Sequence, residues 1–279
     1  MDLSTSAPAD VGAPFADIIA SDRAYFRLGA RFETVPGAEV CVIPALAHNP
    51  AASVVQCVDA GQVAGSGAGW IAGIEDRLEA AGVRIARLYL DQPGTVADTV
   101  LRAAGYEPRE EIPFAGTVAG SGDAEDAGLS YTTITDEAGW ARKLAFHEGS
   151  ADRPDGHASP AAEWVAIERV RCSGGQAATG AMQALLCERG GSPVGAFGLI
   201  DAGRYLRVKN LVVHPGDRRG GVGIAMLRKA SQLAAARGHA GLCLFGVAGH
   251  AGEALYRAAG LREHGRQVEW SRSLGAAHR

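Results

Sequence analysis

The sequence lacks a long basic run, and it lacks an unbroken hydrophobic segment of membrane-spanning length. Its net charge is −4, so it does not indicate a nucleic-acid-binding surface. The longest uncharged run, residues 40–58, is interrupted by two prolines, a histidine and an asparagine, which a lipid-spanning helix would not readily accommodate. No basic residue precedes Arg23, so we expect neither a signal peptide nor a transit peptide. We therefore expect neither nucleic acid nor a membrane as a partner.

Cysteine is scarce, and no two cysteines form a C-x-x-C pair. Their number is odd and they are far apart, so the sequence predicts neither a disulfide framework nor a zinc site. We expect reduced, mostly buried thiols in a cytoplasmic protein. The five residues are Cys41, Cys57, Cys172, Cys187 and Cys243.

The 279 residues are enough for two domains, and an internal repeat supports that division. Residues 100–107, VLRAAGYE, almost match residues 255–263, LYRAAGLRE. At nearly the same offset, Q-x-x-G-x-G beginning at Gln62 matches R-x-x-G-x-G beginning at Arg218. A repeat this long indicates duplicated domains. We predict a loose arm over 1–14, a first domain over 15–118, a linker over 119–128, a second domain over 129–272 and a tail over 273–279.

Hydrophobic periodicity and turn residues predict the order of elements in each domain. In the first domain we expect strands over 40–43, 53–58, 83–90 and 106–114, a glycine-rich elbow over 61–67, and helices over 70–80 and 96–104. In the second we expect a strand over 129–133, a helix capped by Asp136, a helix over 161–171, and a meander over 182–188, 194–201 and 205–214. A helix over 222–237, a strand over 242–247, a helix over 252–259 and closing strands at 261 and 267–271 follow.

Residues 211–237 are the most informative stretch: an apolar strand, a charged, glycine-dense elbow and a long amphipathic helix. The elbow has few side chains where the helix should begin, so backbone can come close to a ligand there. A helix N-terminus presents unpaired N–H groups and the positive end of its dipole, and Arg218 and Arg219 add charge. The pattern is neither a dinucleotide fingerprint nor a P-loop. It predicts a site for an anion such as a pyrophosphate.

The order V-x-P-x-x-R-R-x-G-x-G, from Val213 to Gly223, resembles motif A of the GNAT superfamily, the acetyl-CoA-dependent N-acyltransferases. The predicted element order over 129–272 is also similar to that fold, and the first domain resembles a degenerate copy. The resemblance implies an α+β (α/β) fold of two tandem GNAT-like domains, each a mixed, mostly antiparallel sheet flanked by helices. It implies acetyl-CoA as acyl donor and no metal. The residues that would bind the pantetheine arm are Leu211, Val212 and Val213, and those around the pyrophosphate are Arg218, Arg219, Gly220, Gly221, Val222, Gly223 and Ile224.

A second family motif, N-x-x-A-x-x-L-Y-x-x-x-G-F, is partly present. Tyr256 matches its tyrosine, which in many relatives donates a proton to the leaving thiolate. A phenol of pKa near ~10 can do so, although a tyrosine on an amphipathic helix can also simply pack in the core. Gly249 stands where the family has asparagine, and His250 is one place along, so we include His250 among the expected cofactor-binding residues.

The base that would deprotonate the incoming ammonium group is not identified by the sequence. The candidates are Glu188, Asp201, Asn210 through a water, His250, His147 and His157. We expect the acceptor amine to lie against the polar loop over 147–160. A nucleophilic cysteine is not favoured, because no cysteine is paired in sequence with a placed histidine and direct transfer does not require one.

The leading interpretation is an N-acetyltransferase that moves acetyl from acetyl-CoA to a primary amine of a small polar molecule by direct transfer in a ternary complex. The tandem arrangement also resembles the mycothiol synthases, whose acceptor is an aminosugar thiol. A third interpretation is a non-catalytic protein that binds CoA or another small molecule, because folds outlast their chemistry. The oligomeric state is not predicted, and for the first domain a packing role is favoured over a second cofactor site.

Overall fold

The computed structural model describes residues 12–119, 128–150, 160–174 and 181–275. We call residues 12–119 the first half and residues 128–275 the second half. The helices are α1 (Gly12–Arg27), α2 (Ala60–Ala80), α3 (Val96–Ala103), α4 (Glu137–Gly149), α5 (Ala161–Ser173), α6 (Val222–Ala236) and α7 (Ala251–Ala258). The strands of the first half are β1 (Arg31–Val35), β2 (Ala38–Val42), β3 (Ser53–Gln56), β4 (Ile85–Leu90) and β5 (Glu107–Gly116). Those of the second half are β6 (Leu129–Thr133), β7 (Ala181–Arg189), β8 (Ser192–Ala202), β9 (Tyr205–Val213), β10 (Leu242–Val247), β11 (Arg262–Glu263) and β12 (Gln267–Ser273).

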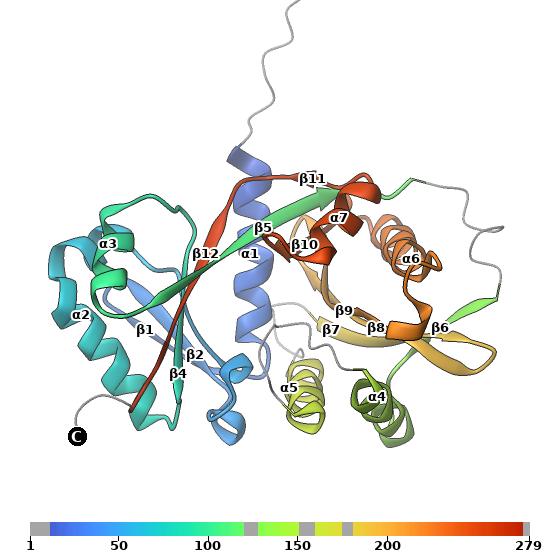
Figure 1. Cartoon of the computed structure of the whole chain (residues 1–279), viewed down its shortest axis with the longest axis horizontal. Coiled ribbons are helices and arrows are strands. Elements are labelled where there is room, and N and C mark those ends of the chain that lie inside the picture. Colours follow the sequence, from blue (N-terminus) through green and yellow to red (C-terminus); the bar gives the residue numbers. More distant parts are fainter. Residues whose placement is uncertain (1–11, 120–127, 151–159, 175–180, 276–279) are drawn as a thin grey trace, which may run out of the picture.

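The two halves share one sheet, whose strand order is β1-β2-β3-β4-β12-β5-β10-β9-β8-β7-β6, with β11 paired to β5. Strand β12 lies between β4 and β5, and β5 pairs with β10. The last strand of each half therefore lies next to strands of the other half (Figure 1). Most neighbours are antiparallel, and the parallel pairs are β3 with β4 and β9 with β10.

The exchange of β5 and β12 also joins the hydrophobic cores. The core under α2 and α3 contains Val268 and Trp270 from β12. The core under α6 contains Ile112 and Phe114 from β5. Trp270 is 1% exposed, so each half buries an aromatic or aliphatic face that the other half supplies.

Helix α1 and helix α6 cover opposite faces of β8 and β9. Successive side chains of a strand point to opposite faces, and on β9 Tyr205 packs with Ile18 of α1 while Leu206 packs with Met226 of α6. In Figure 1, α1 stands upright in the middle of the molecule, between the two halves. It is thus the element that closes one face of the sheet where the halves meet.

Most predicted elements are present within a few residues of their expected bounds, with three differences. Residues 12–27 form α1 and residues 31–35 form β1, neither of which was predicted, so Gly12–Pro14 of the expected arm belong to a helix. The expected elbow over 61–67 is helical up to a kink at Gly67. Asp59 caps that helix, and Trp70, Ile71 and Ile74 bury its apolar face, which offsets the low helix propensity of its glycines. Residues 1–11, most of the expected linker and most of the expected acceptor loop lie outside the described residues.

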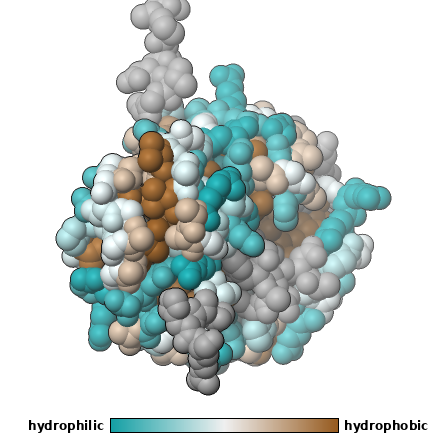
Figure 2. Space-filling view, turned by 60° about the vertical axis from the view of Figure 1, so that its left-hand side comes forward, coloured by the Kyte–Doolittle hydropathy of each residue, from teal (hydrophilic) through white to brown (hydrophobic). Residues whose placement is uncertain are grey.

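The surface in Figure 2 is mostly hydrophilic, with an elongated hydrophobic group on the left of the view. Among the described residues, the large hydrophobic side chains that are exposed are Phe32 and Val96. Within that same part of the chain, no helix combines the length and hydropathy needed to cross a membrane.

Candidate active site

The centre of the site is a gap between two parallel strands. Strands β9 and β10 pair at Leu206 with Leu242 and at Arg207 with Cys243. The pairing stops there, although β9 continues to Val213 and β10 to Val247. A cavity of about 90 Å³ lies at this place, lined by residues of β4, β5, β9, β10 and α7. The strands therefore open toward their carboxyl ends and leave main-chain groups of β9 without a partner from β10.

A bulge in β9 shapes the gap. Asn210 has φ 56°, and the register between β8 and β9 shifts beside it. The Asn210 side chain donates a hydrogen bond to Glu168 of α5 at 3.0 Å. Bulges bend a strand and increase its twist, so this one turns the end of β9 away from β10. The pantetheine-binding residues predicted from sequence, Leu211, Val212 and Val213, lie directly after it.

The elbow after β9 ends in an uncapped helix. Residues Pro215–Asp217 form a short 3-10 turn, and Arg219 and Gly221 have positive φ of 65° and 78°. Gly221 is the N-cap of α6, and within the part of the chain that the structure describes no side chain accepts a hydrogen bond from the helix there. Glycine adopts a φ of 78° without backbone strain, so this residue suits the turn. The first N–H groups of α6 therefore have no side-chain cap, and Arg218 and Arg219, just before them in sequence, are exposed.

The remaining elbow residues hold the helix against its neighbours. Val222 is buried and Ile224 is half-buried. Gly223 faces Leu255 of α7 so closely that an added Cβ would lie 3.0 Å from a methyl carbon. The Arg218 side chain donates to the carbonyl of Val213 at 3.3 Å. The strand, elbow and helix predicted over 211–237 are thus packed as one unit with α7.

The corresponding helix of the first half is capped by its own carboxylate. Asp59 is the N-cap of α2 and accepts hydrogen bonds from the N–H groups of Gly61 and Gln62, at 2.8 and 3.4 Å. Strands β3 and β4 resemble β9 and β10 in being parallel, and they pair at Val55 with Leu88. The two halves therefore repeat the same arrangement, but in the first half an acidic side chain lies where an anion would bind.

Tyr256 lies at the other side of the gap. Its ring packs on Gly246 of β10, where an added Cβ would be 3.3 Å away, and edge-on against Phe114 of β5 with centroids 5.5 Å apart. Burial raises the pKa of Tyr256 to about 12, and the positive charge of Arg207 opposes the shift. Its hydroxyl thus stays protonated at neutral pH, and Tyr256 is one of the residues that line the cavity. His250, at the N-cap of α7, is exposed.

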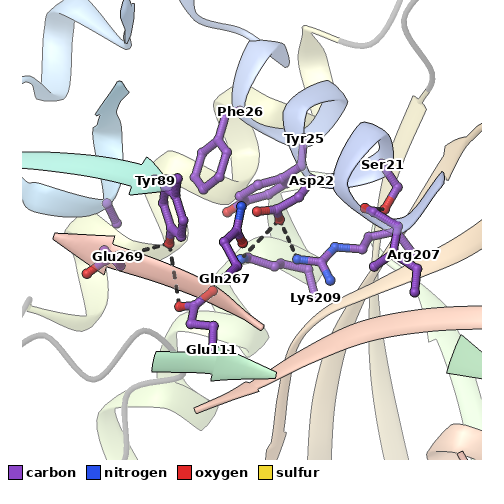
Figure 3. A network of polar contacts seen from close by, with 12 residues as sticks. Ser21, Asp22, Tyr25, Phe26, Tyr89, Glu111, Arg207, Lys209, Gln267 and Glu269 are labelled. Atoms are coloured by element: carbon purple, nitrogen blue, oxygen red, sulfur yellow. Dashed lines mark hydrogen bonds and ion pairs between the residues drawn. The ribbon is translucent and has the colours of Figure 1, made fainter. Parts of the chain in front are cut away.

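The α1 side of the cavity is densely charged, which sequence reasoning missed. Arg207 and Lys209 of β9 both face Asp22 of α1, Arg207 as a buried ion pair and Lys209 at 3.9 Å (Figure 3). Arg87, Arg109 and Glu111 come from β4 and β5 of the first half. Two basic residues at alternate positions of a mostly apolar strand, residues 205–213, were the available signal for a charged inner face.

The base candidates from sequence have other partners or lie elsewhere. Glu188 accepts from Thr132 at 2.6 Å and pairs with Arg142, and these contacts lower its pKa despite burial. Asp201 pairs with His239 at 3.1 Å. His147 is buried in α4, and His157 lies outside the described residues. Among the six candidates, Asn210, which follows Lys209 in β9, lines the cavity.

The pKa of Lys209 predicts how its charge affects stability. Burial and the nearby Arg207 and Arg87 lower this pKa from 10.5 to about 8, although Asp22 and Glu111 oppose the shift. Between pH 8 and 10.5 the unfolded chain holds a proton that the folded chain has lost, so raising the pH favours folding. We expect the free energy of unfolding, measured with urea relative to a Lys209→Met variant, to rise over that range. A flat difference would contradict the pKa, and Lys229→Met is the matched control.

Known structures resemble this architecture over its whole length. A GCN5-related N-acetyltransferase from Kribbella flavida has a TM-score of 0.61 and 16% identity, covering 97% of this chain and 98% of that chain. A GCN5-related N-acetyltransferase from Sphaerobacter thermophilus has a TM-score of 0.59 and 17% identity, covering 96% and 94%. A tandem GNAT protein from the clavulanic acid biosynthesis pathway has a TM-score of 0.55 and 12% identity, covering 98% of both chains.

The chain has the GNAT fold. The predicted α+β class is therefore confirmed. The resemblance to the GNAT superfamily that residues 213–223 suggested is confirmed at the level of the fold, and so is the tandem arrangement of that fold. No protein-family model matches the sequence, and no curated protein matches it significantly. At sequence identities of 12 to 17%, the structural similarity shows the GNAT fold alone. The chemistry is therefore inferred from the residues of the site.

Proposed function

We propose that the chain is an acyl-CoA-dependent N-acyltransferase that moves acetyl from acetyl-CoA to a primary amine of a small polar molecule. One observation carries the proposal: strands β9 and β10 open at a cavity that Tyr256 also lines, and β9 leads from that cavity through the elbow to the uncapped start of α6. An anion at the helix, an extended chain along the strand and a proton donor at the reacting end are what a CoA thioester requires.

The residues present fit acetyl-CoA. The main chain of Leu211, Val212 and Val213 would bind the pantetheine arm, since β10 does not pair with that part of β9. The N–H groups from Gly221 onward would bind the pyrophosphate, with Arg218 and Arg219 beside it and His250 at the start of α7. When bound, acetyl-CoA supplies an acyl group activated as a thioester.

The protein's own part in the reaction is positioning and proton transfer. The two strands hold an amine against the acyl carbon, which accounts for much of the acceleration. Tyr256 gives a hydrogen bond or a proton to the sulfur as the carbon–sulfur bond breaks and the nitrogen–carbon bond forms. Main-chain N–H groups at the opening can polarise the carbonyl.

The capped helix of the first half predicts a single donor site. The Asp59 carboxylate occupies the N–H groups of Gly61 and Gln62 and would repel a pyrophosphate. We expect titration calorimetry to give one acetyl-CoA per chain. A stoichiometry of two would contradict the role assigned to the first half as a packing domain.

The activity itself is tested by following free thiol release from acetyl-CoA against a panel of amines, with aminosugar thiols included. Release with an amine, together with an acetylated product of the expected mass, supports an N-acetyltransferase. Reaction restricted to an aminosugar thiol would favour the mycothiol-synthase-like alternative. Acetyl-CoA binding without release from any amine would instead support the alternative of a non-catalytic CoA-binding protein.

A further inference from the structure

The charged side of the cavity has more cations than carboxylates. Four cationic side chains face three carboxylates around it, among the described residues: Arg87, Arg109, Arg207 and Lys209 against Asp22, Glu111 and Glu269. Burying a charge without a counter-ion is costly. An anionic group of a bound molecule would remove that cost.

Arg207 is placed to receive such a group. It is the third residue of β9 and is fully buried, and its guanidinium lies on the Phe245 ring with 4.2 Å to the centroid. One of its nitrogens donates to Asp22. Within the described residues, its Nε and Nη1 atoms have no hydrogen-bond partner. Each of these two nitrogens can donate a charge-assisted hydrogen bond to a carboxylate.

Glu111 lies at the opposite wall, on β5 next to Val247 of β10. Its side chain is 9% exposed, and its contacts are long: 3.3 Å to Arg109 and 3.5 Å to the hydroxyl of Tyr89. Burial and the nearby Glu269 raise its pKa, while Lys209 and Arg109 oppose the shift. The carboxylate therefore has acceptor capacity left and holds a proton more readily than a surface glutamate.

We propose that the acceptor is a small amine that also carries a carboxylate, of the amino-acid class, bound in this cavity with its carboxylate on Arg207 and its amine at Glu111. The inference rests on the proposed acyl transfer. One proton of the ammonium group passes to Glu111. The nitrogen then bonds the acyl carbon as the carbon–sulfur bond breaks, and its second proton replaces the one that Tyr256 gives to the sulfur. A cavity of about 90 Å³ favours the smallest members of the class.

The competing explanation is that these charges only hold the two halves together. Arg87 and Glu269 do form a buried pair between β4 and β12, and Tyr89 donates to the same carboxylate at 2.6 Å. That explanation requires no ligand at Arg207 and predicts no preference between an amino acid and its amide.

The test compares matched ligands on the unaltered protein. Glycine, alanine and serine are paired with glycinamide, alaninamide and serinamide, which keep the amine and lose the carboxylate. We expect calorimetry in the presence of CoA to show the acids binding about 10- to 100-fold more tightly than the amides. We expect kcat/KM for thiol release to differ in the same direction. Equal or weaker binding of the acids would overturn the proposal.

The two proposals fail in different ways. Preferential binding of the acids without thiol release from any amine would support the carboxylate site and contradict the transferase. Thiol release from the amides as fast as from the acids would support the transferase and overturn the carboxylate site.

A Glu111→Gln variant tests the amine end. We expect its kcat to fall about 100-fold, with the dissociation constants of the acid and of acetyl-CoA unchanged, and we expect the acidic limb of the wild-type pH profile to disappear. Glu110→Gln is the matched control, because Glu110 is the exposed neighbour on the same strand. A Glu111→Gln variant with full activity and an unchanged pH profile would overturn the role of Glu111.

Discussion

Replacing Tyr256 with phenylalanine is expected to lower kcat for thiol release about 100-fold and to leave the dissociation constant of acetyl-CoA unchanged. The ring packs on Gly246 and Phe114, and phenylalanine keeps those contacts. Only the hydroxyl is removed, and burial keeps its pKa near 12, so it is a donor at neutral pH. The leaving sulfur then departs without the proton that Tyr256 would supply. Initial rates with a saturating amine, together with calorimetry for acetyl-CoA, separate the two effects.

Tyr205→Phe provides the control, because Tyr205 lies at the other end of β9 against Ile18 of α1. It removes a phenol hydroxyl far from the opening and should leave kcat unaltered. If Tyr256→Phe retains the wild-type rate, Tyr256 is a packing residue and the protonation step belongs to another group. If Tyr256→Phe instead loses acetyl-CoA binding, the hydroxyl contributes to binding the donor before the reaction begins.

An aspartate at position 221 is expected to weaken acetyl-CoA binding about 30-fold. Gly221 caps α6 without a side chain, and the change would give this helix the acidic cap that Asp59 gives α2. The new carboxylate would compete for the helix N–H groups and repel the pyrophosphate, by about 2 kcal/mol for a partly screened charge pair. Calorimetry at two salt concentrations measures the loss, which should shrink at high ionic strength.

Gly221→Asn is the matched variant for this change. Asparagine has nearly the same size and also tolerates positive φ, so it carries the steric and backbone cost without the charge. We expect it to bind acetyl-CoA at least tenfold more tightly than the aspartate variant. Equal affinities for the two variants would indicate that the elbow does not hold the pyrophosphate.

The sequence predicted the local units of the fold well. The strand, elbow and helix over 211–237 depend on hydrophobic period and on a glycine at positive φ, and both are properties of neighbouring residues. Helix α1 was missed because its apolar face contains a carboxylate: Asp22 lies on the side of Ile18 and Tyr25, where it pairs with buried Arg207. The aspartate at position 22 is explained only by the position of Arg207 in the folded structure.

The exchange of β5 and β12 could not be predicted, because strand pairing at long range leaves no periodic signal. Trp270 belongs to the second half and Phe114 to the first, yet each lies in the core of the other half. The same exchange brings Glu111 to the cavity of the second half. The strand, elbow and helix that we propose bind the donor are local in sequence and were therefore predictable as structure, whereas the charged side chains that we propose bind the acceptor come from both halves and were not.

The most direct test of the account is hydrogen–deuterium exchange of the amides with and without acetyl-CoA. The central claim is that the main chain at the end of β9 and the start of α6 binds the donor. We predict slower exchange over residues 211–224 on adding acetyl-CoA and no change over residues 57–63, where Asp59 already caps α2. Protection of residues 57–63 instead, or unchanged exchange over 211–224 at saturating acetyl-CoA, would contradict the claim.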